Sequence, residues 1–201
     1  MRATAEDGTV VDLNADGSWT AVPQPPVGSN ISNEDGFRGV PWGSARADVK
    51  RLESVELDHE SENYLAYDLK LAGLAALGVY FFAGDTLVRG KYVLTETYQN
   101  LMNHLTDFDA LLNLLEKKYG KPADDQSFWS GDLYKDDYLE WGMAVATGDY
   151  TRFVNWVTDD STVYLSLTGE NFEVSVNVEY TSNRHKGIEQ AHKEESYLQD
   201  L

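Results

Sequence analysis

The chain has 201 residues, of which 34 are acidic and 16 basic, and its formal net charge is −18. A chain of this charge has little with which to neutralise phosphates, so nucleic acid and anionic membrane surfaces are not expected partners, whereas a basic protein, a cation and a neutral polymer are left open. The sequence contains no cysteine, which excludes disulfides, thiolate metal sites, iron–sulfur clusters and cysteine nucleophiles.

The N-terminal segment has the pattern of a β-hairpin. A β-prone run at residues 9–13 is followed by the turn-forming residues 14–17, Asn-Ala-Asp-Gly, and by a second run at 19–22. Proline and glycine are then concentrated in residues 23–36. We therefore predict a hairpin arm over residues 1–22, joined to the main body by a linker over 23–36.

The main body is predicted to span residues 37–183 and to begin with a short helix. Ser44 is suited to the N-cap position, and apolar residues recur at helical spacing behind it, which predicts a helix over 44–54. An acidic loop that contains His59 is expected next. Three β-prone stretches follow, at 64–71, 75–82 and 86–95.

A longer helix is the clearest local prediction. Apolar residues recur at alternating steps of four and three from Leu101 to Tyr119. Thr106 and Asp109 have the spacing of a capping box, so the helix is expected to restart there. Gly120 and the proline two residues later are expected to end it.

The remainder of the main body is predicted to be β-structure. The candidate strands are 127–134, 138–147, 150–158, 161–168 and 171–181. A weak apolar stripe predicts a surface helix or tail over 184–201. Because helices and antiparallel strands are segregated along the chain, the predicted class is α+β, with a curved antiparallel sheet and helices packed on one face.

Two short motifs are the main basis of a resemblance to known proteins. Phe37–Gly43, Phe-Arg-Gly-Val-Pro-Trp-Gly, precedes the first predicted helix, and Lys118–Pro122, Lys-Tyr-Gly-Lys-Pro, ends the long one. With Trp156, Val163–Leu167 and Tyr180, they resemble a family of uncharacterised bacterial proteins that are often exported or lipoprotein-like. The opening Trp-Gly, helix and sheet also resemble the α+β domains of β-lactamase inhibitor proteins. Neither resemblance implies catalytic residues.

The hairpin itself resembles a segment found just after the signal peptides of exported bacterial proteins. This resemblance implies an extracytoplasmic location, either periplasmic or secreted. The first residues have no apolar signal core, so a cytoplasmic protein and a chain whose signal has been removed both stay open. No stretch of the sequence is long and apolar enough to predict a membrane span.

A weak calcium motif coincides with the predicted hairpin turn. Asp12, Asn14 and Asp16 match the first half of a calcium-binding loop, but the position that requires a bidentate glutamate is Pro23. Hairpin turns favour the same residues for backbone reasons. A plain turn is therefore the preferred interpretation, and no metal site is predicted.

Motifs for cofactors and for common catalytic groups are missing from the sequence. The four histidines, His59, His104, His185 and His192, do not have the spacing of metal ligands. Neither nucleotide-binding glycine motifs nor the local motifs of serine hydrolases occur. We therefore predict no cofactor and assign no catalytic residue.

Acidic and aromatic residues alternate between positions 129 and 160. Trp129, Tyr134, Trp141 and Trp156 are the candidate binding residues in this stretch. Carboxylates beside aromatic rings are typical of glycan-binding proteins and of glycoside hydrolases, but buried aromatic residues of an acidic sheet protein give the same pattern.

The sequence therefore leaves three hypotheses. The first is a non-enzymatic protein-interaction or binding module that uses the open face or the edge of the sheet, where exposed aromatic residues can act as hot spots. The second is a glycan-binding protein or an acid/base glycoside hydrolase. The third is a structural domain that self-associates through the sheet edge or the C-terminal helix.

Overall fold

The computed structural model describes residues 2–4, 10–13, 19–21 and 36–199. The chain divides into two compact units, residues 1–32 and 33–201. The first unit contains a three-stranded antiparallel sheet in the order β1–β2–β3. Its strands are β1 (Arg2–Thr4), β2 (Val10–Leu13) and β3 (Trp19–Ala21).

The pairing of β2 with β3 confirms the predicted hairpin strands, since Leu13 lies opposite Trp19. The first strand, β1, was not predicted. The predicted turn at 14–17 and residues 23–35 of the predicted linker lie outside the described residues.

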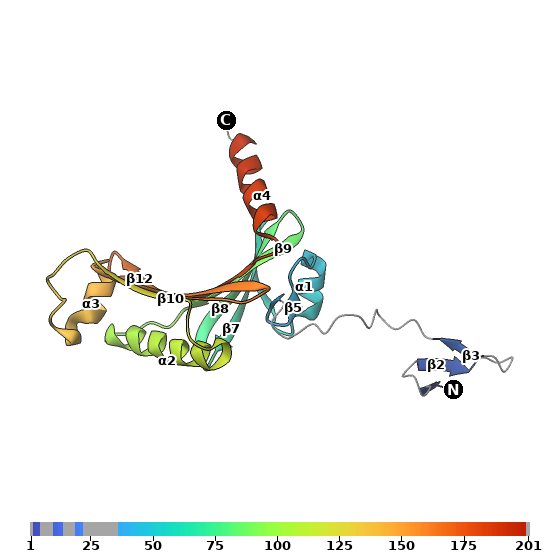
Figure 1. The fold of residues 1–201 in the computed structure, drawn as a ribbon, viewed down its shortest axis with the longest axis horizontal. Coiled ribbons are helices and arrows are strands. Elements are labelled where there is room, and N and C mark those ends of the chain that lie inside the picture. Colours follow the sequence, from blue (N-terminus) through green and yellow to red (C-terminus); the bar gives the residue numbers. More distant parts are fainter. Residues whose placement is uncertain (1, 5–9, 14–18, 22–35, 200–201) are drawn as a thin grey trace. The chain divides into compact units, whose positions relative to one another are not determined.

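An eight-stranded antiparallel sheet dominates the second unit, in the order β10–β11–β12–β13–β9–β8–β7–β6. Its strands are β6 (Leu57–Glu60), β7 (Tyr64–Leu71), β8 (Leu74–Ala83), β9 (Thr86–Leu94), β10 (Asp124–Trp129), β11 (Tyr150–Val157), β12 (Ser161–Glu170) and β13 (Glu173–Ser182). A small two-stranded sheet, β4 (Gly36–Phe37) and β5 (Val40–Pro41), precedes it. The sheet is curved and open (Figure 1), which confirms the predicted α+β class.

Helices flank both sides of this sheet. They are α1 (Arg46–Leu52), α2 (Met102–Tyr119), α3 (Trp141–Ala146) and α4 (Lys186–Gln199), with a 3-10 turn, η1 (Tyr138–Glu140), before α3. Helices α2 and α3 cover one face, whereas α4 projects from the other side (Figure 1). We call these the covered face and the open face.

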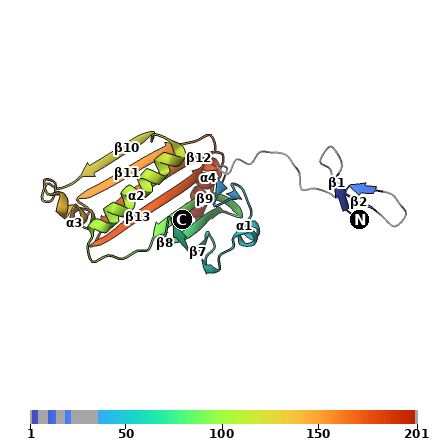
Figure 2. The ribbon, with the colours of Figure 1, turned by 90° about the horizontal axis from the view of Figure 1, so that it is seen from below.

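The core lies on the covered face and has two parts. Helix α2 runs across β12 and β13 (Figure 2) and buries Leu105 and Phe108 in one cluster with apolar side chains of those strands. The second part surrounds α1, where Val49 packs with Phe37 and Tyr80. Alternation along the strands supplies both parts, since every second side chain points to the covered face.

The predicted strand at 138–147 is wrong, because the segment forms η1 and α3. A short apolar run does not show from its periodicity whether it is a strand or a helix. Helix α3 buries the small residues Gly142 and Ala144. A side chain at Gly142 would lie 2.6 Å from the Met102 amide nitrogen, so the glycine permits close contact with the start of α2.

Two expectations around the first helix are also wrong. The acidic segment around His59 is a strand, β6, which pairs with β7. Ser44 does not cap α1: its hydroxyl donates to the Pro41 carbonyl at 2.7 Å. Instead, Asp85 in the β8–β9 turn accepts a hydrogen bond from the Arg46 amide at 3.0 Å, which satisfies one of the free donors at the helix start.

Helix α2 is continuous, so the predicted restart at Thr106 is wrong. The Thr106 hydroxyl donates to the Met102 carbonyl one turn earlier, at 3.3 Å, instead of capping a new helix. The predicted end is confirmed, because α2 stops at Tyr119 and Gly120 follows with a φ of 80°, a conformation that favours glycine.

Candidate functional site

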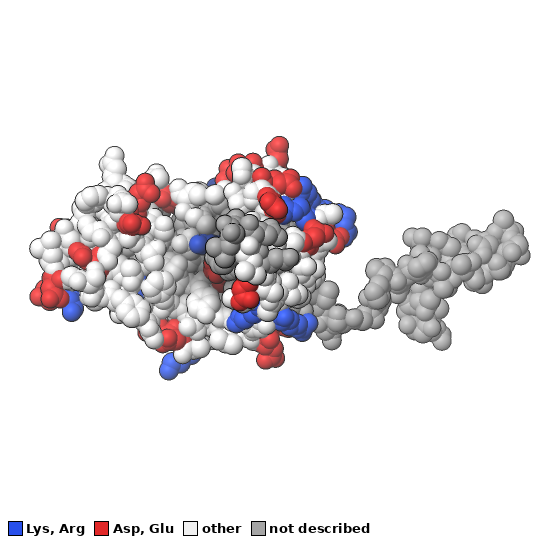
Figure 3. Space-filling model, turned by 90° about the horizontal axis from the view of Figure 1, so that it is seen from above, with Lys and Arg blue, Asp and Glu red and all other residues white. Residues whose placement is uncertain are grey.

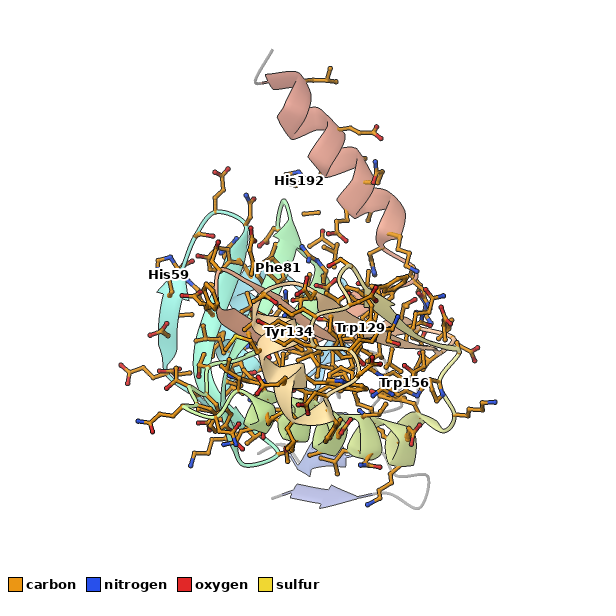
Figure 4. The ribbon with its side chains drawn as sticks, turned by 90° about the vertical axis from the view of Figure 1, so that its left-hand side faces the viewer. His59, Phe81, Trp129, Tyr134, Trp156 and His192 are labelled. Atoms are coloured by element: carbon orange, nitrogen blue, oxygen red, sulfur yellow. The ribbon has the colours of Figure 1, made fainter. Side chains whose placement is uncertain are left out.

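The four aromatic residues singled out in the sequence lie on the covered side of the sheet. Trp156 is only 2% exposed, and its indole N–H donates to the Gly120 carbonyl at 2.9 Å. Trp129 and Trp141 are partly buried, with ring centroids 5.3 Å apart, and Tyr134 packs against the same core. Trp156 lies between the sheet and α2 (Figure 4), and Trp129 and Tyr134 pack against the same core cluster, so these rings contribute to the core.

A small cavity adjoins Trp141 on this side. Its volume is about 40 Å³, which is enough for water molecules but far below the several hundred Å³ of a typical ligand site. The lining residues are Leu105, Phe108, Asp109, Tyr138, Trp141, Tyr150, Arg152 and Leu167. A sugar ring does not fit this space.

The carboxylates near this cavity form ion pairs. Arg152 donates to both oxygens of Asp125, at 3.0 and 2.8 Å, and lies 3.5 Å from Asp109. The hydrogen bonds from Arg152 lower the pKa of Asp125, against the opposing effect of burial. A glycosidase acid requires a raised pKa, so Asp125 does not fit that role.

A serine–histidine pair occurs at the start of α4. The Ser182 hydroxyl and His185 Nδ1 are 2.8 Å apart, a separation suited to nucleophile activation. However, Ser182 has no exposed surface, so a substrate cannot reach it. Ser161, on the neighbouring strand, accepts a hydrogen bond from the Trp42 indole at 2.8 Å. These contacts join the end of the sheet to the segments that flank it.

His104 lies in a second polar cluster, at the first turns of α2. The Tyr98 hydroxyl donates to Asp107 at 2.8 Å, which raises the pKa of Tyr98 to about 12. Burial lowers the pKa of His104, while the nearby Asp107 opposes this shift. The cluster attaches the segment before α2 to the helix.

A third polar network lies beneath the β7–β9 end of the sheet. Arg38 donates to both carboxylate oxygens of Glu53, and the Tyr80 hydroxyl donates to the same carboxylate. Burial raises the pKa of Glu53, but the hydrogen bonds from Arg38 and Tyr80 more than compensate, and the pKa is lowered overall. The network connects the β4–β5 turn, the end of α1 and β8.

Within the described part of the chain, no group of three metal-ligating side chains is arranged to hold an ion. Of the weak calcium motif, Asp12 lies on β2, whereas Asn14 and Asp16 lie outside the described residues.

A hollow larger than the cavity beside Trp141 lies on the open face. It is a shallow depression of about 470 Å³, which we call the open-face depression. Its lining residues are Asp58, His59, Tyr64, Ala66, Leu77, Val79 and Phe81. His59 and Phe81 lie on the side of the sheet from which α4 projects, and His192 extends from α4 itself (Figure 4).

Strand β8 supplies the apolar floor of this depression. Leu77, Val79 and Phe81 point to the open face, whereas Tyr80 and Phe82 point to the core. A strand that is apolar on both faces is typical of a sheet covered on both sides. Here α4 lies near the end of the strand, and on the open side Leu77 and Phe81 are partly exposed, whereas Val79 between them is buried.

A second group of exposed aromatic residues lies at the opposite end of the open face. Phe128, Phe153 and Tyr164 are 52%, 41% and 42% exposed, and the two phenylalanine rings lie 6.2 Å apart. Seen from this side, charged side chains gather towards the margins and leave a mostly uncharged area (Figure 3). The charges of this strongly acidic chain, whose net charge is −18, are therefore unevenly spread over the open face.

Arg89 lies between the two apolar areas. Its guanidinium carbon is 4.2 Å from the centre of the Phe81 ring, a cation–π contact. It also pairs with Glu179 and Glu189 at 3.2 Å each. Because Glu189 belongs to α4, this contact connects the C-terminal helix to the open face.

Neither the open-face depression nor its apolar floor was predicted from the sequence. The signal was present in the uninterrupted apolar sequence of β8, Leu74–Ala83. Its two apolar faces could have been recognised, but which of them would be uncovered depends on where α2 and α4 pack.

Comparison of the chain with protein-family models, curated proteins and solved structures found no match. The resemblances noted in the sequence therefore stay predictions. Among the described residues, no helix has both the length and the apolar character needed to cross a membrane.

Proposed function

We propose that this protein is a non-enzymatic interaction module whose open face binds a partner protein. The observation that carries the proposal is the apolar open-face side of β8, where Leu77, Val79 and Phe81 form the floor of the open-face depression. Apolar and aromatic side chains in a hollow with a polar rim are typical of protein-binding hot spots.

The rim indicates the chemistry of the partner. Asp58 and His59 border the depression, and Glu60 and Glu62 lie nearby in the sequence. The chain as a whole is strongly acidic. The expected partner therefore presents one or two apolar side chains to the depression, surrounded by basic residues that increase the rate of association.

The glycan alternative has less support. Its four candidate aromatic residues lie on the covered side, and the nearby cavity of about 40 Å³ is too small for a sugar. On the open face, the rings of Phe128 and Phe153 are inclined by 59°, so they do not form one flat stacking platform. The N-terminal resemblance supports an extracytoplasmic bacterial location as part of the proposal.

Site-specific photo-crosslinking tests this function. A photoreactive phenylalanine analogue at Phe81 should crosslink one partner protein, whereas the same analogue at Leu114, which is exposed on α2, should not. The partner, once identified by mass spectrometry and purified, is then titrated against Leu77→Asp and against the control Leu114→Asp.

Leu77→Asp is expected to weaken the affinity at least tenfold, because it places a charge on the apolar floor, while Leu114→Asp should leave it unchanged. Equal affinities for wild type and Leu77→Asp, with both variants folded by circular dichroism, would contradict the proposal.

A further inference from the structure

The two edges of the large sheet differ in how they are protected. Strand β6 has four residues, a register shift between Leu57 and His59, and a glutamate, Glu60, bound by Lys50 at 2.7 Å. Short, irregular and charged edges are common devices against strand pairing. Strand β10, at the opposite edge, has six residues in unbroken register with β11.

Among the described residues, no strand pairs with the outer side of β10. Its residues from Asp124 to Phe128 are all exposed, and β10 forms the margin of the sheet (Figure 2). The Ser130 amide donates to the Asp149 carbonyl in continuation of the β10–β11 register. Because orientation alternates along a strand, the amides that point away from β11 belong to Asp125, Ser127 and Trp129.

In one antiparallel arrangement, the residues of β10 are complementary to those of β10 in a second copy of the chain. If a second copy pairs about a twofold axis at Ser127, Asp125 lies opposite Trp129 of that copy, and Gln126 lies opposite Phe128. No acidic residue then faces another, although the strand contains two. This register is the one that pairs all three outward amides, whereas an axis at Asp125 would oppose like charges, which is unfavourable.

We propose that two copies of this chain associate through antiparallel pairing of their β10 edges, forming one continuous sheet. The inference uses the edge of the sheet and is independent of the open-face proposal. Phe128 and Phe153, which lie side by side and half exposed on the open face near this edge, add apolar contact across the junction. Twofold pairing of this kind closes after two copies.

The association is expected to be weak and to strengthen with salt. Pairing a single short strand covers less than the roughly 800 Å² per partner of a standard interface. The two copies carry a formal charge of −18 each, and their repulsion is reduced at about 0.5 M salt, where the Debye length falls to a few Å.

Analytical ultracentrifugation of the full chain and two charge variants tests the inference. In high salt, the wild type should show a concentration-dependent monomer–dimer equilibrium. Ser127→Lys and Ser127→Asp each place like charges opposite one another at the twofold axis, so each variant alone should dimerise at least tenfold more weakly. An equimolar mixture of the two should recover a dimer, because the opposed charges are then opposite in sign.

Controls separate edge pairing from other association. Ser175→Lys introduces the same charge at an exposed position on β13 and should leave the equilibrium unchanged. In this cysteine-free chain, Ser127→Cys should form a disulfide-linked dimer, since paired strands place opposite Cα atoms within bridging distance. A wild type that stays monomeric at high concentration would overturn the inference. So would dimers that persist in both charge variants.

Discussion

The covered and open faces of the large sheet are both rich in apolar residues, but they differ in how far these residues are exposed. On β11, Trp156 points into the core and is 2% exposed, whereas Phe153 on the opposite face is 41% exposed. Helices α2 and α3 cover the first face, while α4 projects from the second (Figure 1). The comparison shows that aromatic content alone does not reveal a binding surface, because the position of the helices decides which side is free.

The largest expected effect comes from the covered face. Trp156→Ala should lower the free energy of unfolding by about 3–5 kcal/mol, since it leaves a cavity and removes the hydrogen bond to Gly120. Phe153→Ala, on the same strand, should cost less than about 1 kcal/mol. Urea unfolding of both variants measures the difference, and equal losses would contradict the assignment of the two faces.

A smaller effect is expected from the partly buried network of Arg38, Glu53 and Tyr80. Glu53→Gln should lower the free energy of unfolding by about 2 kcal/mol at neutral pH, because it removes hydrogen bonds to a charged group. Glu179→Gln removes the more exposed ion pair with Arg89 on the open face and should cost less than about 1 kcal/mol. Urea unfolding at neutral pH compares the two variants, and a larger loss for Glu179→Gln would reverse this ranking.

The pH dependence of stability provides a sharper test of this network. The folded-state pKa of Glu53 is lowered, so its contribution is fully present above the unfolded-state pKa of about 4.5 and is lost as the pH falls through the folded value. Denaturant unfolding at several pH values between about 7 and 3 should therefore show a weaker acid dependence for Glu53→Gln than for the wild type. An identical acid dependence would show that Glu53 is not held in this network.

Much of the fold could be predicted from local patterns. The alternation along β13 and the helical spacing along α2 both depend on one buried side, and Gly120 ends α2 as expected. The segment of α3 was misassigned because its small residues, Gly142 among them, bury themselves by contact with α2. That contact joins parts of the chain far apart in the sequence, and no local pattern reveals it.

The candidate site was less predictable than the fold. The sequence directed attention to Trp129, Trp141 and Trp156 because tryptophan beside carboxylates is typical of ligand sites. In the structure these rings pack between the sheet and its helices. The open-face depression instead uses Leu77, Val79 and Phe81. These are ordinary apolar residues, and the partial exposure of Leu77 and Phe81 depends on where the described helices pack.

The most direct test of the division between the two faces is hydroxyl-radical footprinting of the chain, alone and bound to the partner found by crosslinking. Binding should protect Tyr64 and Phe81 on the open face, leave the exposed Leu114 on α2 as reactive as before, and leave the buried Trp156 unreactive in both states. Protection of α2 with no change at Tyr64 and Phe81 would contradict the account.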